Sequence, residues 1–216
     1  KRAIAIRELD DLEGLRTEAA AIRDRVLADL DVWIDAFERE ATRRGATVLY
    51  AETGADASKL VIEICRRHDL TKAIKSKSML SEEAQLNAAL EAAGVQPVET
   101  DLGEYICQLA GEPPSHIIAP VIHKTRADIA ELFASKHKRP RVEEGEAMTR
   151  EAREMLRPHF LSADLGISGG NFLIAETGSG VIVTNEGNGR MVTTLPRVHV
   201  CITGIEKVIP TLEDFS

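Results

Sequence analysis

The stretch KAIKSKSMLSEEAQLNAALEAAGVQPVE, residues 72–99, decides the fold. It predicts a strand over 72–75, a helix over 81–93 and a strand over 95–99, because short apolar runs flank a longer segment with helical spacing. Two strands joined by a helix are typical of a parallel pair, since the crossover returns the chain to the starting edge of the sheet. This stretch therefore indicates a parallel α/β sheet.

The same alternation of strands and helices extends in both directions along the chain. Before the central stretch, the pattern predicts a strand over 46–51 and a helix over 56–68. After it, the pattern predicts a helix over 103–110, a strand over 116–119 and a helix over 125–135, which Thr125 opens with Asp128 three residues later. The expected fold class is α/β, with a mostly parallel sheet flanked by helices.

The two ends of the chain do not follow this alternation of strands and helices. Apolar residues at steps of three and four over 17–44 predict one long amphipathic helix, which Gly45 ends. A helix over 148–157 leads into strand patterns from residue 163 onward, and we expect those strands to complete the same sheet system.

We therefore divide the chain into an N-terminal helical segment, 1–45, and an α/β domain, 46–216. Within the domain, KHKRPRVEEGEA over 136–147 has clustered charges with a proline and a glycine, which predicts an exposed linker or lid.

Composition excludes several classes of protein. The net charge of −8 argues against a nucleic-acid surface, which needs a basic face. The apolar runs are too short to span a bilayer, and the N-terminus lacks the apolar core of a secretion signal, so we expect a cytoplasmic protein. The widely separated Cys65, Cys107 and Cys201 form neither a metal knuckle nor an even disulfide set, and we expect free, buried thiols.

Polar residues follow both strands of the central stretch, where ligands bind in open α/β sheets. Lys75, Ser76, Lys77 and Ser78 are candidates for holding a phosphate or carboxylate, although lysines at a strand end are as often only solvated, and Ser81 is the expected cap of the next helix. After the second strand, 99–104 contains three carboxylates. We expect Asp101 to cap the following helix, with Glu104 complementing its dipole, and catalysis by these groups is the alternative.

The segment GISGGNFLIAETGSGVIVTNEGNGR, residues 166–190, combines glycine-rich turns with polar groups at two strand ends. Glu176 and Glu186 follow the apolar runs, and the glycines and asparagines of 168–171 and 185–190 adopt positive φ at low cost and form amide nests for anions. Ordinary hairpin turns are the commoner use of such residues. The spacing matches neither of the glycine fingerprints of nucleotide-binding loops.

A last candidate pair lies in the strand after Pro196. Alternation places Arg197 and His199 on one face, where they could bind a carboxylate substrate or pair structurally with a glutamate.

Four long strings of this chain resemble the LUD-domain family of iron–sulfur subunits in bacterial lactate utilization, the LutB-like proteins. The resemblance covers nearly the whole chain. The strings are KSKSMLSEEAQLNAALEAAG (75–94), ETDLGEYICQLAGEPPSHIIAP (99–120) with HKT (123–125), GISGGNFLIAETGSGVIVTNEGNGR (166–190) and LPRVHVCITGIEKVIPTLED (195–214).

The resemblance implies a fold similar to the NagB/RpiA/CoA-transferase group and a role with LutA-like and LutC-like subunits in oxidising L-lactate to pyruvate. It also implies 4Fe-4S clusters. Their cysteine ligands, which need closely spaced motifs, are absent from this sequence, so we expect them beyond Ser216 and expect no cofactor or metal within the chain.

The resemblance and the residue patterns together give a set of candidate site residues. The catalytic candidates are Glu176, Glu186 and His199, acting as general bases or orienting a ligand. The candidates for binding a small carboxylate or phosphate are Lys75, Ser76, Lys77, Ser78, Ser168, Gly169, Gly170, Asn171, Thr177, Gly178, Asn185, Asn188, Arg190 and Arg197.

Three functional hypotheses follow. The first is a ligand-binding subunit of a lactate-oxidising complex, which would be inactive in isolation because no electron acceptor is evident. The second is a non-catalytic assembly scaffold that docks partners through its long first helix and the 136–147 segment. The third is an enzyme similar to the CoA transferases that uses Glu176 as its nucleophile, which is an analogy at the level of fold.

Overall fold

The computed structural model describes residues 2–116, 118–184 and 186–215. The chain divides into two compact units that interleave along the sequence. Unit 1 comprises Lys1–Leu49, Gly170–Ile182 and Thr203–Ser216, and unit 2 comprises Tyr50–Gly169 and Val183–Ile202. The segment 1–45 thus lies wholly in unit 1.

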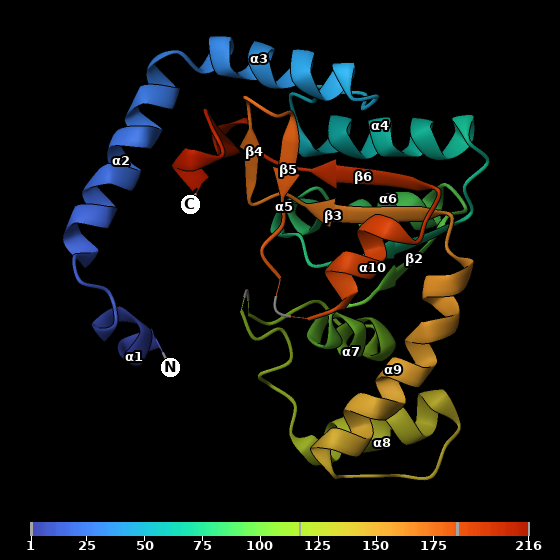
Figure 1. Cartoon of the computed structure of the whole chain (residues 1–216). Helices are drawn as coiled ribbons and strands as arrows, with labels where there is room; N and C mark the ends of the chain where they lie inside the picture. The colour runs from blue at the N-terminus through green and yellow to red at the C-terminus, as the bar shows by residue number, and fades with distance from the viewer. Residues whose placement is uncertain (1, 117, 185, 216) are drawn as a thin grey trace. The chain divides into compact units, whose positions relative to one another are not determined.

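Unit 2 is built on a parallel sheet, which confirms the predicted α/β class. Within the described residues the sheet has four strands in the order β2-β1-β3-β6 (Figure 1). Neighbouring strands pair in parallel, with Lys75 opposite Glu99 on one side and opposite Ile167 on the other. The strands are β1 (Lys72–Lys75), β2 (Gln96–Glu99), β3 (Leu165–Gly169) and β6 (Val198–Ile202).

Helices cover both faces of this sheet. On one face, α4 (Gly54–Arg67), α5 (Met79–Glu83) and α6 (Leu86–Ala92) enclose a core that includes Leu86, Leu90 and Leu165. The single helix predicted over 81–93 is wrong. Gln85 adopts a left-handed conformation with φ of 50°, which separates α5 from α6.

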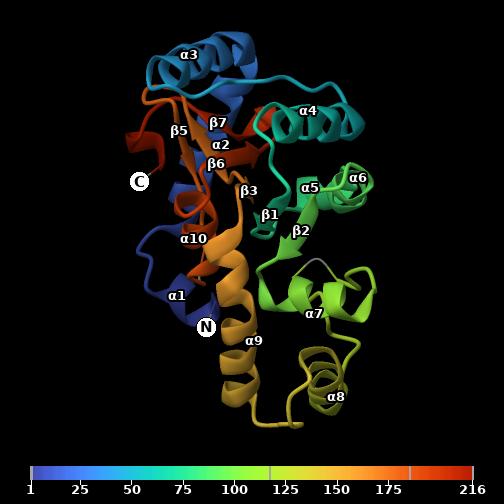
Figure 2. The ribbon, with the colours of Figure 1, turned by 90° about the vertical axis from the view of Figure 1, so that its right-hand side faces the viewer.

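The opposite face packs against later helices. A core that includes Ile74, Phe133 and Val192 holds them to the sheet. Figures 1 and 2 show α10 next to β3, and α9 leading into β3. Thr125 and Asp128 form the predicted capping box at the start of α8. These helices are α7 (Leu102–Ala110), α8 (Arg126–His137), α9 (Gly145–Ser162) and α10 (Asn188–Thr194).

Two predicted strands are wrong. Residues 46–51, all of them described, form no strand, and Leu49 and Tyr50 are exposed. The described residues of 116–119 also form no strand, because the His116 ring nitrogen Nδ1 accepts hydrogen bonds from the amides of Ile118 and Ala119. A side chain thereby binds the donors that a strand would use for its ladder.

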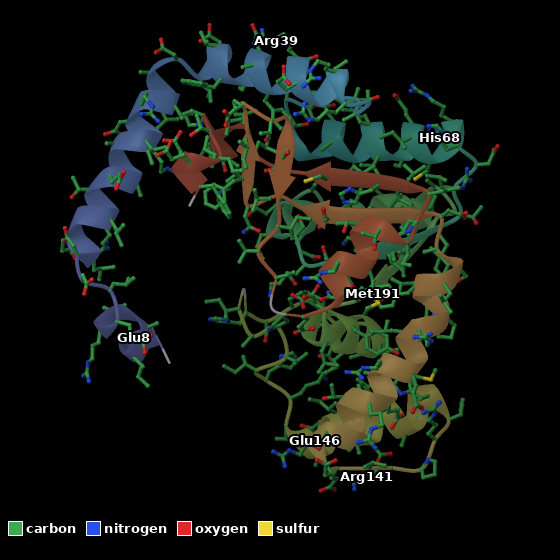
Figure 3. The ribbon with its side chains drawn as sticks, viewed as in Figure 1. Glu8, Arg39, His68, Arg141, Glu146 and Met191 are labelled. Carbon is green, nitrogen blue, oxygen red and sulfur yellow. The ribbon has the colours of Figure 1, made fainter. Side chains whose placement is uncertain are left out.

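The connection between α8 and α9 is shorter than the predicted segment 136–147. Helix α8 runs through His137, whose side chain is buried, and α9 begins at Gly145. Residues 138–144 between them are mostly exposed, and Figure 3 shows Arg141 and Glu146 at this end of unit 2. A role as a lid stays a prediction.

Unit 1 has its own small core. In the described part of the chain its sheet has three strands in the order β5-β4-β7, and Val26, Ala175 and Val208 are buried with Trp33 and Phe37 packed against them. Its elements are α1 (Arg2–Arg7), α2 (Leu12–Ala28), α3 (Leu30–Arg43), β4 (Phe172–Ile174), β5 (Ser179–Val181), β7 (Val208–Ile209) and the 3-10 turns η1 (Ile205–Lys207) and η2 (Glu213–Phe215).

Unit 1 corrects two further expectations. The helix predicted over 17–44 breaks at Asp29, whose φ of −132° is not helical and which ends α2 and begins α3. The strands after residue 163 do not complete one sheet, because β3 and β6 join the parallel sheet and β4, β5 and β7 form another. Gly45, with φ of 91°, follows the end of α3, as predicted for the end of the N-terminal helical segment.

The helices of the described residues contain no segment that is both long enough and apolar enough to cross a membrane.

Candidate functional site

The polar residues after β1 and β2 lie at the carboxyl edge of the parallel sheet, where ligands bind in open α/β folds. We call this group the carboxyl-edge cluster. It lies within unit 2. Its members are Lys75, Lys77, Glu82, Asn87, Glu99, Asp101, Glu104, Glu186 and Asn188.

The centre of the cluster is a buried ion pair. Lys75 is only 1% exposed, and its Nζ donates to Glu99 Oε1 at 2.7 Å and to Asn87 Oδ1 at 2.5 Å. Asn87 Nδ2 also donates to Glu99 Oε1, at 2.6 Å, and Glu82 Oε1 lies 3.7 Å from the ammonium group. A buried charge pair of this kind is tolerable only when such hydrogen bonds satisfy it. Lys75 is therefore not a solvated strand-end lysine.

The prediction that the Asp101 side chain caps α7 is wrong. It occupies the N-cap position of α7, yet within the described residues its carboxylate makes no capping hydrogen bond. Asp101 Oδ2 instead accepts from the amide of Lys77 at 2.6 Å and from Asn188 Nδ2 at 2.8 Å. The carboxylate thus joins the segments after β1 and β2 to the start of α10.

Lys77 provides the accessible positive charge of the cluster. Its Nζ lies 2.8 Å from Glu104 Oε1, and its side chain is 30% exposed, whereas Glu104 is buried. Lys77 can therefore reach a ligand from solvent without breaking the Lys75–Glu99 pair.

Burial raises the pKa values of several carboxylates in the cluster, and the charges of neighbouring carboxylates add to the increase. Burial raises the pKa of Asp101 above its ordinary value, and the charges of Glu104 and Glu99 add to the increase against opposing hydrogen bonds. Burial likewise raises the pKa of Glu82. Glu186 is exposed as a residue, yet the surrounding protein partly desolvates its carboxylate, and this, followed by the charges of Asp101 and Glu104, raises its pKa. Such groups are suited to accepting or sharing a proton.

Asn188 leaves one acceptor of the cluster without a partner. Its Nδ2 donates to Asp101 and also to Thr100 Oγ1 at 3.2 Å, while its buried Oδ1 has no hydrogen-bond partner among the described residues. The residue is 6% exposed. A buried amide oxygen without a donor costs about 1–3 kcal/mol, so a hydroxyl or a water that donated a hydrogen bond to this atom would remove that cost.

The predicted turn at 185–190 is only partly a turn. Its second half, from Asn188, is the first turn of α10. Arg190 is exposed on this helix, and its carbonyl accepts from the Thr193 and Thr194 hydroxyls. Asn185 lies outside the described residues.

The predicted serines are structural neighbours of the cluster. Ser78, and not Ser81, caps α5 by accepting from the amide of Ser81 at 3.3 Å. Ser76 is buried, and its amide donates to Ile167 O at 3.0 Å. A Cβ atom on Gly169 would meet Ser78 Oγ at 3.2 Å, so this glycine allows close packing within unit 2.

Ser168 and His199 are also brought together, on β3 and β6. Ser168 Oγ and His199 Nε2 lie 2.9 Å apart, and burial lowers the pKa of His199. Arg197 is at the other, amino-terminal edge of the sheet, where it binds Asp164 and the carbonyl of His68, the residue labelled at the end of α4 in Figure 3. The structure does not bring Arg197 to Lys75.

Five predicted residues belong to unit 1: Gly170, Asn171, Glu176, Thr177 and Gly178. Glu176 is exposed, and its Oε2 accepts from the amide of Leu212 at 3.2 Å. Gly178 has φ of 61°, and a Cβ there would lie 2.3 Å from the amide nitrogen of Ala41. Within unit 1 the turn after β4 therefore packs on the end of α3.

The three cysteines do not fit an iron–sulfur cluster. Cys65 and Cys107 are buried in α4 and α7, and Cys201 is exposed in β6, which contradicts the expectation of a buried thiol there. Within 2–116, 118–184 and 186–215, no group of three His, Cys, Asp or Glu residues is placed to hold a metal ion. A 4Fe-4S cluster needs converging thiolates, so we derive no step through one.

Sequence reasoning missed Glu82 and Asn87. A single helix over 81–93 does not predict that both side chains approach Lys75, because the break at Gln85 separates the helix that carries Glu82 from the helix that carries Asn87. Asn87 stands between the buried Leu86 and Leu90, and a polar residue beside core positions is the signal that identifies it.

Known proteins resemble this chain over most of its length. It is 44% identical over 207 residues to the "Uncharacterized electron transport protein YkgF" of Escherichia coli K12, covering 96% of this chain and 44% of that protein. It is 43% and 41% identical over 217 residues to proteins named "Lactate utilization protein B" from Lysinibacillus sphaericus and Bacillus subtilis, covering all of this chain and 46% and 45% of those proteins.

The chain spans less than half the length of these relatives. No solved structure matches it. The LUD domain matches residues 34–216, which include the whole carboxyl-edge cluster. The chain therefore belongs to the LUD domain family.

Proposed function

We propose that this chain is the LUD-domain part of a lactate-utilization protein and that its carboxyl-edge cluster binds a small 2-hydroxycarboxylate such as L-lactate. The relatives named for lactate utilization support the pathway. The observation that carries the site is the unpartnered, buried Asn188 Oδ1 beside Asp101 and Lys77.

The chemistry of a 2-hydroxycarboxylate matches these groups. Lys77 is exposed enough to exchange its Glu104 partner for the ligand carboxylate. The ligand hydroxyl donates to Asn188 Oδ1, which removes the cost of the unpaired acceptor. Asp101, whose pKa is raised, accepts a hydrogen bond from the same Asn188 side chain, and for any later proton transfer the hydroxyl would have to turn its one hydrogen from Asn188 to this carboxylate.

Oxidation of the hydroxyl carbon also needs an acceptor for two electrons. The cysteines of this chain do not fit an iron–sulfur cluster. We therefore assign electron transfer to clusters outside this chain and to LutA-like and LutC-like subunits, and we assign ligand binding to this domain.

The role in the pathway is tested by deleting the gene for this chain from its host. Growth on L-lactate as sole carbon source should be lost and growth on pyruvate kept, and the wild-type gene should restore growth. A gene with Lys77→Gln should restore it poorly, whereas one with Lys138→Gln, a change on the exposed connection after α8, should restore it fully. A deletion strain that grows normally on lactate contradicts the proposal.

The scaffold alternative depends on a free apolar stripe along the first helices. In unit 1, Leu30, Trp33, Ile34 and Phe37 pack against the unit's own core. This leaves less of the stripe for docking, and the ligand-binding function is better supported.

A further inference from the structure

A cavity lies in unit 2, at the end of the sheet where β2 begins. Its volume is about 630 Å³, within the range of roughly 300–1,000 Å³ typical of small-molecule sites. Residues from β2, α7, α8 and α9 line it, and Figure 2 shows these elements as neighbours. None of the carboxyl-edge cluster residues lines it.

The cavity cannot take an added β-strand, although β2 is an edge strand. Pro97 has no amide hydrogen to offer. Gln108 occupies the other edge groups, since its Nε2 donates to Pro97 O and its Oε1 accepts from the amide of Glu99, both at 3.0 Å. With the backbone edge closed, the occupant is a small molecule and not an extended peptide.

Two polar groups at the cavity lack partners. His159 Nδ1 is buried without a hydrogen bond within the described residues. Lys136 lines the cavity from the end of α8, and its ammonium group makes no ion pair with any described residue. Burial, and then the charge of Lys72, lowers the pKa of His159, so its imidazole is neutral and able to donate one hydrogen bond.

The charges limit the ligand to one negative group. Lys136 is opposed by Glu91, which also lines the cavity. A dianion such as phosphate would face this carboxylate with a single lysine to balance it, whereas a monocarboxylate is matched.

The rest of the wall combines apolar side chains with polar ones that are held in place by hydrogen bonds. Leu109 and Met155 face the cavity, which suits a hydrocarbon or ring. His137 is 2% exposed at its side chain and is held between Tyr105 Oη at 2.9 Å and Glu151 Oε1 at 2.7 Å. This chain of hydrogen bonds joins α7, α8 and α9, so the wall is already in place before a ligand enters.

We propose that this cavity is a second binding site, for a small monocarboxylate with an apolar body, whose carboxylate contacts Lys136 and His159. It is independent of the proposed hydroxycarboxylate site, since it requires no hydroxyl and uses other residues.

The probe is hexanoate, titrated into the full chain by isothermal calorimetry, with hexanol and acetate as controls. Hexanoate should bind with a Kd on the order of 1 mM or tighter, as expected for so small a ligand. Hexanol should bind about tenfold more weakly because it lacks the charge, and acetate should bind more weakly because it lacks the apolar body.

Two neighbouring lysines give a matched pair of variants. Lys136→Gln should weaken hexanoate binding about fivefold or more, while Lys138→Gln, which changes a lysine that does not line the cavity, should not. NMR signals of the His159 ring should shift with hexanoate in the wild type. Absence of binding, equal effects of the two substitutions, or equal affinities for hexanoate and hexanol would each overturn the proposal.

Discussion

At the scale of single residues, the tightest constraint in unit 2 is Gly166 on β3. A Cβ atom there would lie 2.0 Å from the carbonyl oxygen of Val192 on α10. Gly166→Ala should therefore push α10 away from the sheet and lower the free energy of unfolding by about 1–3 kcal/mol or more, as overpacked cores do.

Urea denaturation measures this loss, and Gly145→Ala is the matched control. Apart from its chain neighbours and the backbone of its own helix, no described atom lies within 4 Å of the Cβ position of Gly145. This control should be neutral or stabilising, because alanine restricts the unfolded chain. Equal stabilities of the two variants would show that the contact between β3 and α10 is not as close as described.

The buried pair of Lys75 and Glu99 makes a second residue-scale prediction. Lys75→Met leaves Glu99 as an uncompensated buried charge and should cost about 3–5 kcal/mol in the free energy of unfolding. The double variant Lys75→Met with Glu99→Gln should recover much of that loss. A double-mutant cycle with no coupling between the two positions would contradict the buried ion pair.

Sequence reasoning predicted the place of these residues in the fold more reliably than their individual roles. The strand 72–75 was enough to place Lys75 at the carboxyl edge of a parallel sheet. The assignment of Asp101 as a cap failed because capping residues are recognised by local spacing, whereas its actual partner, Asn188, is 87 residues away in sequence. Local patterns do not contain such contacts.

At the scale of secondary-structure elements, β2 depends on Gln108 to close its outer edge. The side chain of Gln108 replaces a neighbouring strand by pairing with Pro97 O and the amide of Glu99. Gln108→Leu should leave these groups unpaired and destabilise the fold by about 1–3 kcal/mol. Hydrogen exchange at the Glu99 amide should accelerate in this variant.

The control is a substitution of Gln96, a glutamine that lies on β2 itself. Gln96 is exposed, and Gln96→Leu removes no edge hydrogen bond that involves a side chain. If both substitutions left exchange at Glu99 unchanged, Gln108 would not be the group that protects the edge.

Elements with strong local signals were predicted well. The apolar spacing of α4 and the capping box of α8 are complete within each segment. The breaks at Asp29 and Gln85 were missed because apolar spacing continues across both, and the change in direction depends on the core that each half packs against.

At the scale of the whole molecule, the partly desolvated carboxylates of the carboxyl-edge cluster make stability depend on pH. Glu186 has a raised pKa, so the folded state binds its proton more tightly than the unfolded chain does. The stability that this group contributes is therefore greatest at low pH and falls as the pH rises from about 4, its unfolded value, through its folded pKa.

Glu186→Gln removes the desolvation cost and the repulsion of the charged carboxylate, and it should raise the melting temperature at pH 8 but not at pH 4. Glu143→Gln should give no increase at either pH, since Glu143 pairs with Arg141 on the surface. Calorimetry at both pH values measures the difference. A gain for Glu186→Gln that persisted at pH 4 would show that the cost of the ionised carboxylate is not the cause.

The sequence predicted the α/β class but not the division into two interleaved units. Residues 166–190 read as one continuous candidate site, yet Gly169 and Gly170 fall in different units. Each unit is completed by segments distant in sequence, so its boundary depends on tertiary packing and leaves no composition change at Gly170.

The central claim is that the carboxyl-edge cluster binds a 2-hydroxycarboxylate through Lys77 and Asn188. Its most direct test is calorimetric titration of the full chain with L-lactate and with propionate, which lacks only the hydroxyl. Lactate should bind about tenfold more tightly than propionate, because only its hydroxyl satisfies Asn188 Oδ1. Lys77→Gln should abolish the binding and Lys136→Gln should preserve it. Equal affinities for lactate and propionate, or lactate binding that survives Lys77→Gln, would contradict the account.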